Sequence, residues 1–156
     1  MYTHYMVKVQ KIPFTEFKKI YSRVPRLCVE VVLMRGKSLL LIRRTIKPAI
    51  GQWHTPGGTV LKGEDLEQAV QRVAFEELGV VVKVLKFIGV IEYRSYINHY
   101  SQDVSLAFTV RAKNNKKFDL DGHADKYSFF SEIPKNTIHD QKEFYKKNLN
   151  MKILKN

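Results

Sequence analysis

The sequence of 156 residues contains a single cysteine, Cys28, and no apolar run that approaches the roughly 18 residues of a membrane-spanning helix. One cysteine has no partner within its chain, which excludes a disulfide scaffold and fits a reducing compartment. The sequence also lacks internal repeats, low-complexity tracts and Pro/Gly/Ser-rich linkers, so a single domain over residues 1–156 is the simplest organisation. Residues 1–12 lack the apolar segment and cleavage site of a secretory signal. We therefore expect a cytoplasmic protein with no membrane partner.

Acidic residues are scarce, with 15 Asp and Glu against 27 Lys and Arg and a formal net charge of +12. This charge could attract nucleic acid or phosphorylated metabolites, or could simply be a lysine-rich solvated surface. We find no basic stripe interleaved with aromatics and no helix-turn-helix, so a nucleic-acid partner is not predicted. A third of the acidic residues fall in one window: Glu64, Asp65, Glu67, Glu76 and Glu77. Such a window in a basic protein is the natural place to look for a metal site.

Hydrophobic periodicity predicts alternating strands and helices. Helices are expected over 15–21, 64–78 and 141–149, and strands over 26–34, 39–43, 80–92, 104–112 and 126–130. Thr15 and Asp140 are predicted to cap the first and last helices, and Gly79 to end the middle one. Residues 45–58 contain two prolines and three glycines and are predicted to be a loop. The pattern favours an α+β fold, a mixed sheet with helices packed on it, with an N-terminal extension and its short helix over about residues 1–24.

The predicted helix over 64–78 carries a carboxylate on its apolar face. The apolar stripe consists of Leu66, Ala69, Val70, Val73 and Ala74. Glu77 falls within this stripe and Glu76 lies at its edge. A carboxylate facing the core is costly unless its charge is compensated, and the C-terminal end of a helix repels anions. A bound Mg²⁺ or Mn²⁺ would compensate it, and so would a buried salt bridge from Glu77 to Arg72 or Arg44.

The spacing of residues over 58–80 discriminates between these two readings. The fixed positions are Gly58, Glu64, Arg72, Glu76, Glu77, Gly79 and Val80, preceded by Trp53-His-Thr-Pro-Gly-Gly58. This pattern resembles the Nudix box, G-x5-E-x7-R-E-U-x-E-E-x-G-U, where U is a bulky apolar residue. The resemblance implies a Nudix fold, an α/β/α sandwich with a mixed sheet between helices and the box as loop, helix and loop. It also implies a Mg²⁺-dependent hydrolase in which Mn²⁺ can replace Mg²⁺.

Two positions depart from the box. Ala74 is small for its apolar slot, and Val73 stands where the family usually has a metal-binding glutamate. The resemblance then implies metal ligation by Glu77 and the backbone carbonyl of Gly58, with Glu76 near. A site with fewer carboxylates favours one metal ion rather than several, and a decayed, inactive site is the alternative.

Outside the box, residues from about 14 to 149 are similar to the GDP-mannose mannosyl hydrolase branch of the family. The similar segments are 43–49, 51–58 and 121–127, with a terminal helix containing Phe144-Tyr145. That branch also lacks the glutamate at the position of Val73. The resemblance implies cleavage of the C–O bond at the anomeric carbon of a nucleotide sugar, release of nucleoside diphosphate and free sugar, and a homodimer to which the N-terminal segment contributes. Attack at carbon needs the metal mainly to neutralise the leaving diphosphate.

The resemblance also implies roles for individual residues. Arg44 would bind the diphosphate through its bidentate fork, although strand alternation alone says only that one of Arg43 and Arg44 faces inward. Glu30 and Tyr93 would contact base or sugar, and Tyr93 replaces a histidine of the branch. Glu76 would act in catalysis or metal binding beside Glu77.

The resemblance implies that His123 is the general base, since the base of the branch is a histidine in the late loop. A neutral imidazole suits this role because it can take a proton from water near neutral pH. If Tyr127 is aligned differently, His123 shifts by one position and becomes a metal ligand. The third possibility is a solvated loop histidine. His54 and His99 are lone histidines, which are more often neither ligands nor substrate contacts.

Two other functions are compatible with the sequence. The first is a Nudix pyrophosphatase that attacks phosphorus in nucleoside triphosphates or nucleoside diphosphate derivatives. The second is a non-catalytic Nudix-fold protein that binds RNA or regulates, whose affinity would fall steeply with salt. Val73 argues against the first, and product identity separates it from the predicted nucleotide-sugar hydrolase.

Overall fold

The computed structural model describes residues 11–95, 99–114 and 117–155. Its elements follow the order α1 (Phe14–Tyr21), β1 (Arg26–Arg35), β2 (Ser38–Arg44), β3 (Trp53–His54), β4 (Gly57–Thr59), α2 (Leu66–Leu78), β5 (Val82–Glu92), β6 (Asp103–Ala112), β7 (Ala124–Phe130) and α3 (His139–Asn148). Among the described residues, no helix is both long and apolar enough to cross a membrane.

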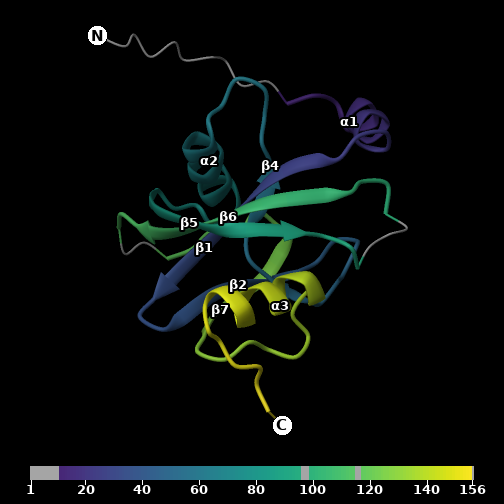
Figure 1. Cartoon of the computed structure of the whole chain (residues 1–156). Coiled ribbons are helices and arrows are strands. Elements are labelled where there is room, and N and C mark those ends of the chain that lie inside the picture. Colours follow the sequence, from purple (N-terminus) through teal and green to yellow (C-terminus); the bar gives the residue numbers. More distant parts are fainter. Residues whose placement is uncertain (1–10, 96–98, 115–116, 156) are drawn as a thin grey trace.

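β1 is the central strand of a mixed sheet (Figure 1). It pairs in parallel with β6, from Arg26 opposite Asp103 to Leu33 opposite Val110. It pairs antiparallel with β2 through the turn at Gly36 and antiparallel with β4. The main path of the sheet runs β3-β2-β1-β6-β5, and β7 pairs with β2. Residues far apart in the chain are thereby brought to the ends of the same strands.

Alternate residues of β1 serve two hydrophobic cores, because successive side chains of a strand point to opposite faces. Val31 and Leu33 belong to the core beneath α2, whereas Val32 packs in the core that contains Phe144 and Tyr145 of α3. Figure 1 shows α2 and α3 on opposite sides of the sheet. The predicted α+β fold with a mixed sheet between helices is confirmed.

α2 begins two residues later than the sequence suggested. Asp65 is its N-cap and forms a capping box with Gln68, and Gly79 ends it with a left-handed φ of 68°. Glu64 stays outside the helix, where its Oε2 accepts the backbone N–H of Leu61 at 2.9 Å. The guanidinium of Arg72 donates to both oxygens of Glu64, at 2.6 and 2.9 Å. This clamp ties the loop before α2 to the helix.

Several local predictions were wrong. Pro13 and not Thr15 is the N-cap of α1, since the fixed φ of proline already suits a helix start. Asp140 lies inside the first turn of α3, after Ile138, and its Oδ2 accepts the N–H of Ser95 at 3.2 Å. The predicted loop over 45–58 contains β3 and the start of β4. β3 pairs with β2 and β4 pairs with β1. Because these partners lie elsewhere in the chain, no local sequence pattern predicts the two short strands. Residues 1–10 of the predicted N-terminal extension lie outside the described residues, as do residues 96–98 and 115–116.

Candidate functional site

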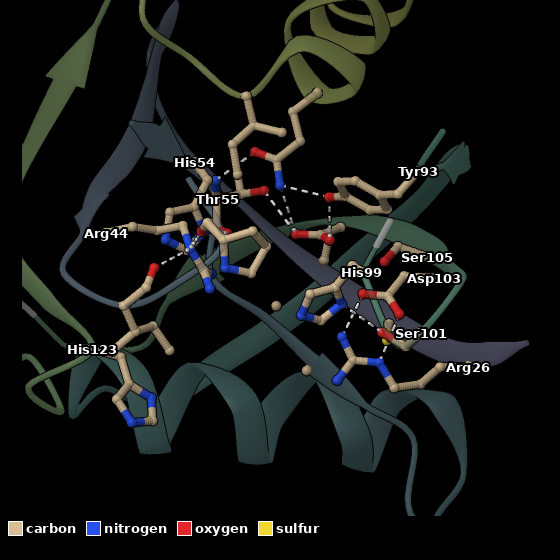
Figure 2. A pocket seen from close by; sticks show the side chains of 18 of the residues that line it. Arg26, Arg44, His54, Thr55, Tyr93, His99, Ser101, Asp103, Ser105 and His123 are labelled. Atoms are coloured by element: carbon tan, nitrogen blue, oxygen red, sulfur yellow. Dashed lines mark hydrogen bonds and ion pairs between the residues drawn. The ribbon is translucent and has the colours of Figure 1, made fainter. Parts of the chain in front are cut away.

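A cavity of about 390 Å³ opens beside the glycine pair that precedes α2. Its walls include residues of α1, β1, β2, β3, β4, α2, β6 and α3, together with Tyr93 just after β5 and His123 in the loop before β7 (Figure 2). Most of the predicted site residues line it: Glu30, Arg44, Gly58, Glu77, Tyr93 and His123. The fold thus brings together residues separated by almost a hundred positions.

The glycine pair is closely packed from both sides. A methyl group at Gly57 would lie 2.6 Å from Oε2 of Glu30, and one at Gly58 would lie 2.9 Å from Cγ2 of Val73. Only glycine fits at either position, since real Cβ atoms do not approach other atoms so closely. Val73 is buried and packs directly against Gly58. The departure from the box at this position therefore fills the space beside Gly58 with methyl groups rather than with a carboxylate.

Glu77 is the residue of α2 that lines the cavity. Its carboxylate accepts the backbone N–H of Gly57. Burial and the nearby charges of Asp121 and Glu30 raise the pKa of Glu77 well above its ordinary value, while Arg44 acts in the opposite direction. The salt-bridge alternative with Arg72 is not formed, because Arg72 donates to Glu64, Glu76 and the carbonyl of Thr59. Glu77 is a carboxylate held in a setting that penalises its charge.

Glu76 points elsewhere. Its side chain is 36% exposed and pairs with Arg72 at 3.1 Å and with Lys11 at 2.8 Å. Glu76 is not one of the described residues that line the cavity. The structure therefore does not bring Glu76 to Glu77 and Gly58, and its predicted role in catalysis or metal binding stays a prediction.

Protein ligands for a cation are few at this site. In the described part of the chain, no three His, Cys, Asp or Glu side chains are arranged to hold a metal ion. Of the carboxylates that line the cavity, Glu30 accepts hydrogen bonds from Tyr93 and Thr55 and Asp103 pairs with Arg26, whereas Glu77 lies beside the backbone of the glycine pair. A hard cation that keeps several water ligands, as Mg²⁺ does, fits such a sparse oxygen site.

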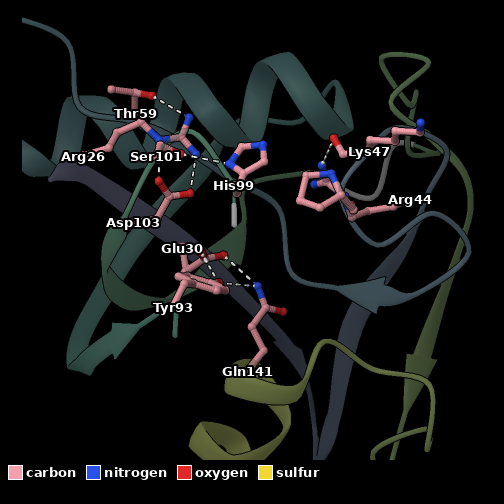
Figure 3. Close-up of polar contacts among 11 residues, drawn as sticks. Arg26, Glu30, Arg44, Lys47, Thr59, Tyr93, His99, Ser101, Asp103 and Gln141 are labelled. Atoms are coloured by element: carbon pink, nitrogen blue, oxygen red, sulfur yellow. Dashed lines mark hydrogen bonds and ion pairs between the residues drawn. The ribbon is translucent and has the colours of Figure 1, made fainter. Parts of the chain in front are cut away.

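Glu30 is buried at the centre of a hydrogen-bond network (Figure 3). Its Oε1 accepts the hydroxyl of Tyr93 at 2.7 Å, and its Oε2 accepts the hydroxyl of Thr55 at 2.9 Å and the amide of Gln141 at 3.4 Å. Burial raises the pKa of Glu30 to about 7, and the hydrogen bonds from Tyr93 and Thr55 limit this rise. Two residues predicted separately as substrate contacts, Glu30 and Tyr93, thus form one rigid wall of the cavity.

Arg44 is the arginine that faces the cavity. Its Nε donates to the carbonyl of Pro48 at 2.8 Å and its Nη2 to that of Lys47 at 3.3 Å, so the loop after β2 orients the guanidinium. Arg43 points away and pairs with Asp125 of β7. The choice that strand alternation left open between the two arginines is resolved in favour of Arg44.

His123 lies at the edge of the cavity, in the loop before β7. Its side chain is 67% exposed, and its Nδ1 lies 3.4 Å from Oδ2 of Asp121. Asp121 also accepts the backbone N–H of His123 at 2.9 Å. The carboxylate thus fixes the backbone of His123 and lies close to its exposed ring.

Some cavity residues were not singled out from the sequence. Arg26 donates to Asp103 at 2.8 Å and to the hydroxyl of Thr59 at 3.3 Å, and Gln141 reaches the cavity from α3 (Figure 3). No local motif marks these residues, because their partners lie on other strands. Asp121 was detectable, since it stands two positions before the predicted base His123.

His54 is buried in the cavity wall, with 7% of its surface exposed. Its Nδ1 lies 2.7 Å from the carbonyl oxygen of Thr55, and its Nε2 is buried without a hydrogen-bond partner. Burial and the charge of Arg44 lower the pKa of His54 to about 3. The imidazole is therefore neutral throughout the physiological range.

This pKa makes the stability of the protein pH-dependent. Between about pH 6.5 and 3 the unfolded chain binds a proton at His54 that the folded chain does not, so stability falls as pH falls, by about 1.4 kcal/mol per pH unit. His54→Phe removes this contribution. We expect urea unfolding to show the variant gaining about 2 kcal/mol relative to the original chain between about pH 7 and 5. A constant difference across this range would show that His54 titrates normally in the folded protein.

Comparison with known proteins places this geometry in a family. The NUDIX domain family matches residues 24–147. The low-salt glycan biosynthesis protein Agl8 of Haloferax volcanii is 42% identical over 83 residues, which are 53% of this chain and 53% of Agl8. The ADP-ribose pyrophosphatase of Methanocaldococcus jannaschii is 38% identical over 66 residues, 42% of this chain and 39% of that protein. This chain thus spans about half the length of the first relative and less of the second.

Solved structures share the architecture. The crystal structure of a MutT NUDIX hydrolase from Burkholderia pseudomallei aligns with a TM-score of 0.70 at 24% identity and covers 78% of this chain and 95% of that one. This likeness shows the fold. The family match extends over most of the chain, including the glycine pair, α2 and the loop that carries His123. The chain therefore belongs to the NUDIX domain family.

Proposed function

We propose that this NUDIX hydrolase acts on a nucleotide sugar and releases nucleoside diphosphate and free sugar, with Mg²⁺ as its cofactor. Val73 packed on Gly58 is the observation that carries the proposal. It leaves Glu77 as the carboxylate that α2 presents to the cavity, which suits a reaction that needs little metal charge. The likeness to a glycan biosynthesis protein supports a sugar substrate.

The residues present fit one hard cation. Glu77 and the carbonyl of Gly58 would hold it, with water completing its coordination. When bound, the cation would neutralise charge on the leaving diphosphate and compensate the carboxylate of Glu77. Mn²⁺ has the same ligand preferences and would serve as a substitute.

The remaining roles belong to the protein's own side chains. Arg44, oriented by the carbonyls of residues 46–48, would bind the diphosphate through its guanidinium. His123, held by Asp121, would take a proton from the attacking water. The wall formed by Glu30 and Tyr93 would contact the sugar or base with groups whose orientation is already fixed.

The position of attack tests the proposal. The protein is incubated with Mg²⁺ and GDP-mannose, and then with other nucleotide sugars, in water enriched in oxygen-18. Attack at the anomeric carbon places the label in the sugar and yields unlabelled nucleoside diphosphate. Label in the phosphate, with nucleoside monophosphate and sugar phosphate as products, would contradict the proposal.

A phosphorus-directed pyrophosphatase is the second candidate. The likeness to an ADP-ribose pyrophosphatase favours it. ADP-ribose and nucleoside triphosphates belong in the same isotope experiment, since preferred turnover of either, with label in phosphate, would establish this alternative.

Arg44→Lys tests the diphosphate site. Lysine keeps the charge but loses the planar fork, so we expect KM for the nucleotide sugar to rise about 10-fold with a smaller change in kcat. Arg43→Lys is the matched control, because Arg43 pairs with Asp125 of β7 outside the cavity. Steady-state kinetics on both variants makes the comparison, and equal effects would remove Arg44 from the proposed site.

A further inference from the structure

The buried Nε2 of His54 has no hydrogen-bond partner among the described residues, and the reaction described above does not use it. β3 positions it: Trp53 packs against Phe130 with ring centroids 4.9 Å apart, and the next residue along the strand, His54, lines the cavity. The ring is thus fixed by the sheet and not by a flexible loop.

The tautomer of His54 follows from its one contact. A carbonyl oxygen can only accept, so the Nδ1 that lies 2.7 Å from the carbonyl of Thr55 must carry the hydrogen. Nε2 then holds a lone pair and can only accept. A buried acceptor without a partner costs about 1–3 kcal/mol, so a native structure that keeps one calls for a partner outside the chain.

The surroundings define what this partner can be. A cation at Nε2 is disfavoured, since the charge of Arg44 already acts on the ring and Mg²⁺ prefers oxygen ligands. A phosphate at neutral pH has few protons to donate. The parts of a nucleotide sugar that adjoin its diphosphate are the two sugar rings, whose donors are hydroxyl groups.

We infer that Nε2 of His54 accepts a hydrogen bond from a sugar hydroxyl next to the diphosphate bound by Arg44, which makes His54 a specificity-determining residue. This rests on the proposed function for the identity of the ligand. His54 is a binding group and not a second base, because its imidazole remains neutral and buried. Removal of the hydroxyl from the ligand, or of the acceptor from the protein, should then have the same effect.

The ¹⁵N resonance of Nε2 in the whole protein gives a direct test without any substitution. Metal-free protein is titrated with GDP-mannose, UDP-glucose, ADP-ribose, ATP and GDP. We expect nucleotide sugars to shift the resonance toward the hydrogen-bonded range and GDP to do so only if the ribose hydroxyl is the donor. Binding seen at backbone amides with no change at Nε2, or no change with any of these ligands, would overturn the inference.

Kinetics on variants completes the test. His54→Phe keeps a ring and removes the acceptor, and we expect its kcat/KM for the natural nucleotide sugar to fall about 10- to 100-fold. For the deoxy substrate, the nucleotide sugar that lacks the contacted hydroxyl, kcat/KM of the variant and of the original chain should be nearly the same. His54→Gln, which offers an amide oxygen, should recover part of the loss, and His139→Phe on the exposed start of α3 is the control. Equal losses with the natural and the deoxy substrate would indicate a structural role and contradict the inference.

The outcomes also separate this inference from the proposed function. If only ATP or ADP-ribose is hydrolysed, with attack at phosphorus, the proposed function fails. The inference then stands only if those ligands shift the Nε2 resonance through a ribose hydroxyl. If nucleotide sugars are hydrolysed at carbon and Nε2 does not respond, the function stands and the inference fails.

Discussion

Replacing Glu77 with glutamine is expected to lower Mg²⁺-dependent turnover by about 10³-fold or more while leaving the fold intact. Glu77 is the carboxylate of α2 at the cavity, and Val73 beside Gly58 provides no second one. Glutamine keeps the shape and the hydrogen bond from Gly57 but cannot supply the charge that attracts the cation. The measurement is kcat/KM as a function of Mg²⁺ concentration.

Glu77→Gln should lower activity without lowering the stability of the metal-free protein. Because the pKa of Glu77 is raised in the folded protein, its ionisation opposes folding as pH rises above the ordinary value of 4.5. Metal-free Glu77→Gln should therefore be at least as stable as the original chain near pH 8. Mg²⁺ should raise the Tm of the original chain and not that of the variant.

Two other substitutions on α2 provide controls for Glu77→Gln. Glu67→Gln alters an exposed residue of the first turn and should change activity by less than about two-fold. Glu76→Gln tests the predicted role of Glu76 in catalysis or metal binding, since its side chain is not among the described ones that line the cavity. A loss as large as that of Glu77→Gln would place Glu76 in the metal site, and near-normal activity of Glu77→Gln would refute the metal assignment.

The parts of the site that lie within one element could be predicted from the sequence. The position of Glu77 on α2 follows from helical periodicity, and the spacing to Gly58 is carried by a contiguous motif. The inward-facing arginine could be predicted only as one of the neighbours Arg43 and Arg44, because successive side chains of a strand point to opposite faces. Which of the two arginines faces the cavity depends on the pairing of β2 with β7, where Arg43 pairs with Asp125.

The parts of the site that join distant elements could not be predicted. Glu30 receives hydrogen bonds from Thr55, Tyr93 and Gln141, and these four residues come from four segments whose proximity depends on the whole sheet topology. The orphaned Nε2 of His54 is likewise invisible in the sequence, because a lone histidine in a loop-like stretch carries no periodic signal. β3 depends on its pairing with β2 and on the bridge from Trp53 to Thr137, and both partners are distant in the sequence.

His123→Ala is expected to reduce kcat by about 10²–10⁴-fold if the imidazole is the general base. KM for the nucleotide sugar should change little, because the diphosphate is bound by Arg44. Exogenous imidazole should restore part of the activity, since a truncated base leaves room for a small substitute. His139→Ala, which removes an exposed histidine at the start of α3, is the control.

The metal dependence of the same variant distinguishes the alternatives that the sequence left open. Loss of a general base lowers kcat at saturating Mg²⁺ and leaves the half-saturating Mg²⁺ concentration unchanged, whereas loss of a ligand raises that concentration. Asp121→Asn adds a second comparison: it retains an acceptor but weakens the hold on the ring 3.4 Å away, so it should lower kcat less than His123→Ala does. A change of only a few-fold in His123→Ala would mean that this exposed histidine is solvated and would remove it from the role of general base.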